Sequence, residues 1–284
     1  MKKETKLINK VKHLLKKAKA PKYLHHFGPK TYQLWEHVFA LFVKAECRLS
    51  FRRTNNFLKL LGIKVASKST LQRYSYKLKL NFWQKIFNFT IDKKSKIVSI
   101  DGTGLSRTSP SQYYIKRIDS QKKFCKGYHF SIIVDEDSKI VSLRIRKKFT
   151  HDIKDVKYLV KRIPFKPEII LMDKGYDSEN LHKFLALQDI WSIAPVKKNG
   201  AKGQFRKKLK NNFPTELYHK RNRVESIFHA FKQKFGASVS SKLIASARTE
   251  VYCKAILHNL FLNLVKLLGQ TQLYRQIYII KIIC

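Results

Sequence analysis

The sequence predicts an α/β fold with a mixed sheet, preceded by an all-helical region. Three observations carry this prediction. Up to about residue 92, apolar residues recur at helical spacing, and from residue 96 short apolar runs typical of strands appear. The later runs alternate with helical segments. We therefore expect a helical region over residues 1–92 and a mixed α/β region over residues 93–284.

The helical region is predicted to hold helices over residues 2–19, 32–45, 50–61 and 69–78. Ser50 and Ser69 can cap the last two of these helices, and Gly62 separates them. Two short helices around a turn are typical of a DNA-binding helix-turn-helix, and equally of an ordinary hairpin with a solvated basic face. As a DNA reader, the last helix would present Lys68, Gln72, Arg73 and Lys77 to a groove.

The second region opens with three strand-like runs joined by short turns, which predicts an antiparallel meander. Two further strands alternate with helices, which predicts parallel crossovers. The expected strands lie at residues 96–101, 128–137, 139–149, 168–173 and 191–196. Helices are expected over 151–163, 178–188 with Ser178 as cap, 218–236 and about 250–268, and a basic loop over 197–212. This order of elements is that of the ribonuclease H-like fold.

The charge of the chain points to a polyanionic partner. It has 60 Lys and Arg residues against 19 Asp and Glu residues, a formal net charge of +41. Nucleic acid is the usual partner of such a field, although a protein that merely coats a polyanion would show the same balance. The scattered cysteines fit a reducing compartment, and no apolar run predicts a signal peptide or a membrane span. We expect a cytoplasmic, nucleoid-associated protein without a membrane partner.

Two aspartates stand out among the acidic residues, most of which are expected in turns or on solvated helix faces. Asp101 and Asp173 each follow an apolar strand, and a glycine comes within two residues of each. The carboxyl ends of strands are where ligand sites form in open α/β sheets, and glycine would let the backbone turn there. A lone aspartate of this kind is by default a turn residue, but two together favour a site.

One acidic residue, Glu225, lies in the middle of the basic segment 218–236. On an ideal helix, which turns about 100° per residue, Glu225 shares a narrow stripe with Tyr218, Arg221 and Lys232. The apolar residues of the segment fall beside that stripe, which places Glu225 at the margin of the core. A simple salt bridge between Arg221 and Glu225, at i and i+4, explains the pattern equally well.

The spacing of these four residues matches a known signature. Tyr218, Arg221, Glu225 and Lys232 resemble, in type and spacing, the Tyr-Arg-Glu-Lys signature of DDE transposases in the insertion-sequence four/five superfamily. The segments Asp101–Thr103 and Asp173–Asp177 resemble the first and second aspartate motifs of that family, and His258–Leu260 its C-terminal segment. The resemblance covers about residues 96–265.

The resemblance implies a ribonuclease H-like enzyme that cleaves DNA strands and transfers them to a target. Asp101, Asp173 and Glu225 would hold two Mg²⁺ ions, which Mn²⁺ can replace, and carboxylates alone suit that choice. Tyr218, Arg221 and Lys232 would hold DNA phosphates. The partner would be double-stranded DNA, both the element ends and the target, and the protein would act on it as a homodimer. The space before Tyr218 is too short for the β-rich subdomain of some relatives, and Trp191 is expected in the core.

Two other functions stay open from the sequence alone. A decayed or domesticated element would be a DNA-binding protein without activity, although the three acidic residues argue against it. Another ribonuclease H-like nuclease, such as a resolvase or an RNA-cleaving enzyme, would share the fold, although the Tyr-Arg-Glu-Lys spacing disfavours it.

Overall fold

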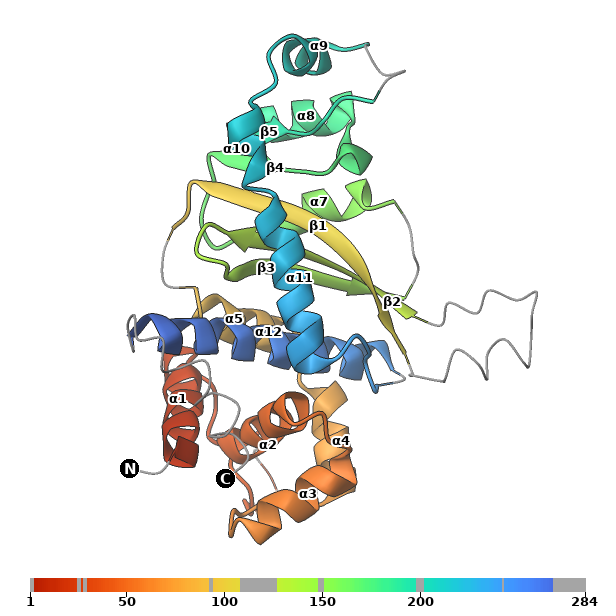
Figure 1. The fold of residues 1–284 in the computed structure, drawn as a ribbon. Coiled ribbons are helices and arrows are strands. Elements are labelled where there is room, and N and C mark those ends of the chain that lie inside the picture. Colours follow the sequence, from red (N-terminus) through yellow and green to blue (C-terminus); the bar gives the residue numbers. More distant parts are fainter. Residues whose placement is uncertain are drawn as a thin grey trace, which may run out of the picture.

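The computed structural model describes residues 3–24, 27, 30–91, 94–107, 127–147, 151–197, 202–241 and 243–267 (Figure 1). The helical region contains α1 (Lys3–Lys17), α2 (Leu34–Glu46), α3 (Phe51–Leu60), α4 (Lys68–Lys77) and α5 (Leu80–Asn88). The strands are β1 (Ile97–Ser106), β2 (Gly127–Asp135), β3 (Ile140–Arg146), β4 (Ile169–Leu171) and β5 (Trp191–Ile193). The remaining helices are α7 (Ile153–Val160), η1 (Lys174–Tyr176), α8 (Glu179–Ala186), α9 (Gln204–Asn211), α10 (Thr215–His219), α11 (Asn222–Phe235) and α12 (Ile244–Leu267).

The described strands form one mixed sheet in the order β3-β2-β1-β4-β5. β1, β2 and β3 pair antiparallel, whereas β4 and β5 run parallel to β1. This is the meander followed by parallel crossovers that the sequence predicts, so the mixed α/β, ribonuclease H-like fold class is confirmed.

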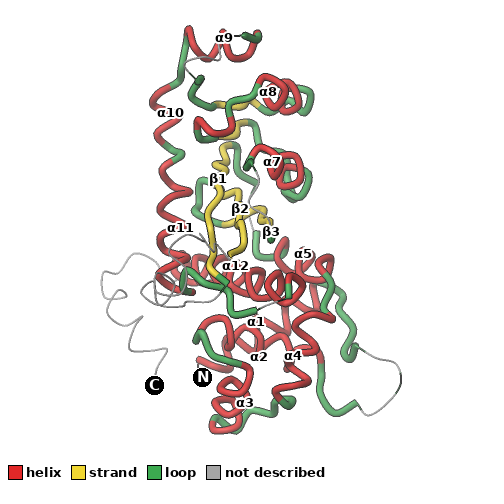
Figure 2. The backbone as a smooth tube through the Cα atoms, turned by 90° about the vertical axis from the view of Figure 1, so that its right-hand side faces the viewer, coloured by secondary structure: helices red, strands yellow, loops and turns green. Residues whose placement is uncertain are grey.

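Helices cover both faces of the sheet. α11 crosses one face, and α7 and α8 lie on the other (Figures 1 and 2). Residues alternate between the faces because the side-chain period of a strand is two. On the α11 face, Phe130 packs against Phe228 and Phe231, with ring centroids 6.0 and 5.3 Å apart. On the α7 face, Ile100 and Ile133 join an apolar cluster with the buried side of α7.

The first strand is longer than predicted, which corrects one expectation. Asp101 does not end the strand; it lies in the middle of β1, where it pairs with Ile132 of β2. Gly102 pairs with Ser131 and makes no turn. The strand continues because β2 offers an antiparallel partner along all of it, whereas the parallel partner β4 ends opposite Ser99.

The helix α12 lies between the sheet and the N-terminal helices (Figure 1). It begins at Ile244, six residues before the predicted start. Glu250 of α12 is buried between Lys44 of α2, at 3.4 Å, and Lys254, at 3.2 Å. One apolar cluster runs from α1 and α2 through α12 to α11. The division of the chain into domains near residue 92 stays a prediction.

The two helices expected to bind DNA are present with one changed cap. The Ser50 hydroxyl accepts a hydrogen bond from the Arg53 amide at 3.2 Å and so caps α3. Ser67, not Ser69, caps α4, because its hydroxyl accepts from the Thr70 amide at 3.3 Å while Ser69 already lies in the first turn. Gly62 has a φ of +68°, the left-handed conformation that ends α3.

Two further expectations differ near the C-terminal half. Ser178 precedes α8 but makes no side-chain cap; Glu179 instead accepts hydrogen bonds from the amides of Phe205 and Arg206 and so caps α9. The basic segment at residues 197–212, predicted to be a loop, contains the helix α9. The apolar segment at residues 274–284 is expected from the sequence either to pack on the core or to form a partner surface, and it lies outside the described residues.

None of the helices in the described ranges is both long enough and apolar enough to span a lipid bilayer.

Candidate active site

Two strands bring Asp101 and Asp173 together. β1 and β4 are parallel and in register at Ser99 and Leu171, and each aspartate lies two residues beyond that pair. Residues two apart point to the same face, and neighbouring strands are about 4.8 Å apart, so the two carboxylates share the α11 face. Asp173 is the N-cap of the short helix η1, and its carbonyl accepts a hydrogen bond from the Tyr176 amide at 2.9 Å. Its carboxylate makes no hydrogen bond or ion pair with another described residue.

The basic segment is two helices, not one. α10 ends at His219 and α11 begins at Asn222, so Tyr218 lies on α10 and Glu225 in the first turn of α11. The junction is a tight turn in which the Arg221 amide bonds to the Tyr218 carbonyl at 2.9 Å and the Val224 amide to the Arg221 carbonyl at 3.0 Å. Such a turn advances about 120° per residue instead of about 100°. The side chains after the junction are therefore rotated from their predicted positions, but the four residues of the predicted stripe still face the same side.

Arg221 joins the parts of the site. Its guanidinium pairs with Glu225, lies 3.7 Å from Asp101 and stands 5.9 Å from the Tyr218 ring. The predicted i, i+4 salt bridge therefore exists, but it is not merely a surface pair. The Arg221 side chain is 12% exposed, and it brings the carboxylates from β1 and α11 to one place.

Burial raises the pKa of Asp101, whereas the Gly102 amide and the Arg221 guanidinium lower it. The charges of Asp173 and Asp152 raise it further, and the net result is a raised pKa. Burial also raises the pKa of Tyr218, with the charge of Arg221 opposing and that of Asp173 adding to the effect. Burial is thus the main cause of both raised pKa values, and the charge of Asp173 adds to it in each case.

Lys232 lies two turns beyond Glu225 on α11. Its ammonium donates a hydrogen bond to the Thr103 hydroxyl at 2.6 Å, and Thr103 points to the same face of β1 as Asp101. The Lys232 ammonium is thus bonded to the residue two positions beyond Asp101 on β1.

The donor set suits a hard divalent cation. Asp101, Asp173 and Glu225 come from three elements on one face, and the Asp173 carboxylate has no partner among the described side chains. Carboxylate oxygens are the ligands that Mg²⁺ and Mn²⁺ prefer. In this structure the Arg221 guanidinium lies between Asp101 and Glu225. Within the described ranges the three carboxylates do not form a set whose ligand atoms all lie within 4.8 Å of one another.

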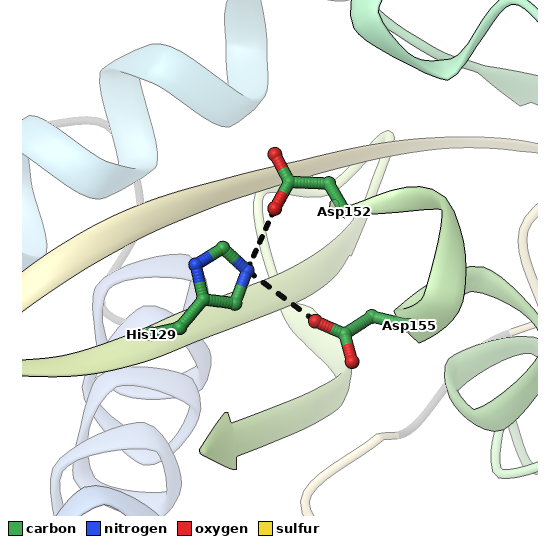
Figure 3. Close-up of side chains that lie close together, drawn as sticks. All are labelled: His129, Asp152 and Asp155. Atoms are coloured by element: carbon green, nitrogen blue, oxygen red, sulfur yellow. Dashed lines mark ion pairs between the residues drawn. The ribbon is translucent and has the colours of Figure 1, made fainter. Parts of the chain in front are cut away.

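A second polar group was not predicted from the sequence. Within the described ranges, His129, Asp152 and Asp155 are the set of possible metal ligands whose ligand atoms all lie within 4.8 Å of one another (Figure 3). Most acidic residues outside the three motifs were expected in turns or on solvated helix faces, but Asp155 is fully buried. The i, i+3 spacing of the two aspartates, with Asp152 at the N-cap and Asp155 in the first turn of α7, was the available signal.

Two other predicted positions can be placed. Lys68, Gln72, Arg73 and Lys77 are all exposed on α4, whose Leu71 is buried. Trp191 was expected in the core but is 50% exposed. It pairs with Ile169 at the amino end of the parallel strands, the end opposite the carboxylates, because β5 begins there at the margin of the sheet.

Comparisons with known proteins assign the family. The chain matches the family described as "Transposase DDE domain" over residues 92–260. No curated protein matches the chain. Among solved structures, a synaptic complex of piggyBac transposase with hairpin DNA aligns with a TM-score of 0.45 and 12% identity, over 89% of this chain and 73% of that one.

A simian T-cell lymphotropic virus intasome aligns with a TM-score of 0.31 and 11% identity, over 75% of this chain and 65% of that one. The family match spans more than half of the sequence and includes Asp101, Asp173 and Glu225. The chain belongs to the transposase DDE domain family.

Proposed function

We propose that this protein is a DNA transposase of an insertion sequence, of the Tyr-Arg-Glu-Lys group, that cleaves element ends and joins them to target DNA. The observation that supports this most is the place of Arg221, which faces both Asp101 and Glu225. Carboxylates that can hold divalent cations, beside a cationic side chain that can hold a phosphate, suit phosphoryl transfer at a metal site.

Asp101, Asp173 and Glu225 are proposed to hold two Mg²⁺ ions. When bound, these ions supply an activated oxygen nucleophile and stabilise the leaving oxygen in an in-line displacement. The protein groups do the remaining work. Arg221 neutralises the carboxylates while DNA is absent, and can turn toward a phosphate once cations take its place. Water would attack the phosphodiester at the element end and release a 3′-hydroxyl, and that hydroxyl would then attack a target phosphodiester and release a target 3′-hydroxyl. Since water and DNA supply the nucleophiles, no covalent bond to the protein is needed.

Tyr218, Arg221 and Lys232 are proposed to hold the phosphates next to the scissile bond. They lie beside the carboxylates, and their hydrogen-bond donors suit phosphate oxygens. The net charge of +41 adds attraction along the rest of the duplex.

The exposed side of α4 is proposed to read element ends. Replacing Lys68 and Arg73 by Ala is expected to weaken binding to end DNA and to lower the slope of log K against log salt by about one unit for each phosphate that is no longer neutralised. Titration of labelled DNA at several salt concentrations measures this. Lys183→Ala on α8 is the control; an equal change in both variants for each charge removed would favour the ordinary helical hairpin.

The function itself is tested with DNA that carries the sequences flanking the gene. With Mg²⁺, the protein should nick the ends and join them to a second DNA, and complexes with paired ends should contain two protein copies. Binding without cleavage would support an inactive, domesticated protein. Cleavage of RNA, or of duplexes without regard to the ends, would support another ribonuclease H-like nuclease.

A further inference from the structure

A polar cluster lies behind the proposed active site, on the opposite face of β1. His129 of β2 points to the α7 face, where its Nε2 atom is 2.8 Å from Asp152 and 3.3 Å from Asp155 (Figure 3). The Ser131 hydroxyl lies between them, 2.9 Å from the ring nitrogen and 2.7 Å from Asp155. Asp155 is fully buried, whereas the Asp152 side chain is 37% exposed.

The contacts of Asp155 argue against a metal ion in this cluster. Arg146 donates two hydrogen bonds to Asp155 Oδ2, at 2.7 and 3.1 Å, and Arg144 lies 2.9 Å from Oδ1. The carboxylate is therefore already neutralised by arginines, and a further cation would face their positive charge. Burial lowers the pKa of His129, but the bonds to Asp152 and Asp155 outweigh it and raise the pKa to about 9. The ring is thus itself a cation at neutral pH.

The cluster lies directly against the backbone of Gly102, the residue after Asp101. A Cβ atom on Gly102 would lie 3.0 Å from His129 Cε1 and 3.2 Å from Asp152 Oδ1, too close for an ordinary contact. Gly102 pairs with Ser131 as regular strand. Glycine is needed here because the ring and the carboxylate approach the strand closely, not because the chain turns.

The same glycine holds the Asp101 carboxylate. The Gly102 amide donates a hydrogen bond to Asp101 Oδ1 at 2.7 Å. Any shift of the Gly102 peptide therefore moves the oxygen that is proposed to bind a cation. Side chains that support a ligand without touching the metal commonly change metal affinity or activity by about 10- to 100-fold.

Resting on the proposed function, we propose that His129 is a positioning residue: its ring, held between Asp152 and Asp155, fixes the Gly102 backbone and thereby the direction of the Asp101 carboxylate toward its cations. Asp152, bonded to the ring at 2.8 Å, is the second member of this support. Neither residue is proposed to touch DNA or the reacting atoms.

His129→Gln and Asp152→Asn test this with nearly unchanged volumes. Both should weaken Mn²⁺ binding to the DNA-free protein and lower the rate of end cleavage, each by about 10-fold or more. Affinity for end DNA in the absence of metal should not change. His258→Gln is the matched control, because that histidine is also buried but lies on α12, bonded to the Ser138 carbonyl. It should alter neither Mn²⁺ binding nor the rate.

A pair of variants separates positioning from folding. Gly102→Ala should lower the melting temperature and weaken Mn²⁺ binding, because its methyl group would meet the His129 ring. Adding His129→Ala should restore the melting temperature, while Mn²⁺ binding should stay weak. Unchanged Mn²⁺ affinity in His129→Gln would overturn the proposal. So would the loss of one whole equivalent of bound Mn²⁺ with the Asp101 site intact, because His129 would then itself be a metal ligand. If the wild type cleaves no DNA, the proposed function fails, yet the Mn²⁺ measurements still decide the role of His129.

Discussion

Replacing Glu225 by Gln is expected to abolish metal-dependent cleavage of end DNA, lowering the rate by at least about a thousand-fold. The amide keeps the size of the side chain but removes the charge that would complete the cation site with Asp101 and Asp173. The loss falls on the transition state, because stabilisation by bound cations contributes several kcal/mol there. Single-turnover cleavage of labelled DNA measures the effect.

The fold should tolerate this change. Glu225 is 55% exposed, and its pair with Arg221 is a helix ion pair of a kind that contributes about 0.3–0.5 kcal/mol. Arg221 also keeps Asp101 as a partner. DNA binding without metal should therefore persist. Glu216→Gln, a neighbouring exposed acidic residue on α10, is the control and should cleave normally; full cleavage by Glu225→Gln would exclude Glu225 from the site.

The largest effect on stability is expected at Glu250. Replacing it by Gln leaves two buried ammonium groups, those of Lys44 and Lys254, without a charged partner. Removing one member of a buried ion network typically costs about 3–5 kcal/mol, because the remaining charge stays desolvated. Chemical denaturation should show this loss in the free energy of unfolding. Glu168→Gln, from the exposed pair with Lys96, should change it by less than about 1 kcal/mol.

The Glu250 contribution should depend on pH in a defined direction. Burial raises the pKa of Glu250, but Lys44, Lys254 and the bonds from Ser240 outweigh burial and lower it to about 2, against an ordinary value of 4.5. A depressed folded-state pKa stabilises the protein above the unfolded value, and this stabilisation disappears as pH falls. The difference in unfolding free energy between wild type and Glu250→Gln should therefore shrink from about pH 5 toward about pH 2. A constant difference would contradict this ionic explanation.

The sequence was sufficient to predict the sheet and the three motifs, because both depend on local patterns. Apolar runs and acidic turns predict the meander, and the fixed spacing around Glu225 predicts which side chains share a stripe. The length of β1 could not be predicted, since Gly102 and Gly104 look like turn residues until their β2 partners are known. The break at Lys220–Arg221 was equally hidden, because a tight turn hardly disturbs the helical pattern.

The support behind Asp101 could not be found in the sequence for a different reason. Asp152 and Asp155 lie three residues apart, but His129 is distant from both along the chain and meets them only through the pairing of β2 and the packing of α7. The same holds for Glu250 and Lys44, which lie 206 residues apart. Sequence patterns report the face on which a residue lies, but the partner across a tertiary contact requires the fold.

The central proposal is that Asp101, Asp173 and Glu225 hold the catalytic cations. Fe²⁺ bound in place of Mg²⁺ produces, with ascorbate and peroxide, radicals that cut the polypeptide beside the metal ligands. The proposal predicts fragments from cuts near residues 101, 173 and 225, all absent in Asp173→Asn and still present, although weaker, in Asp155→Asn. Cuts that survive in Asp173→Asn and disappear in Asp155→Asn would contradict it and place the metal in the His129 cluster instead.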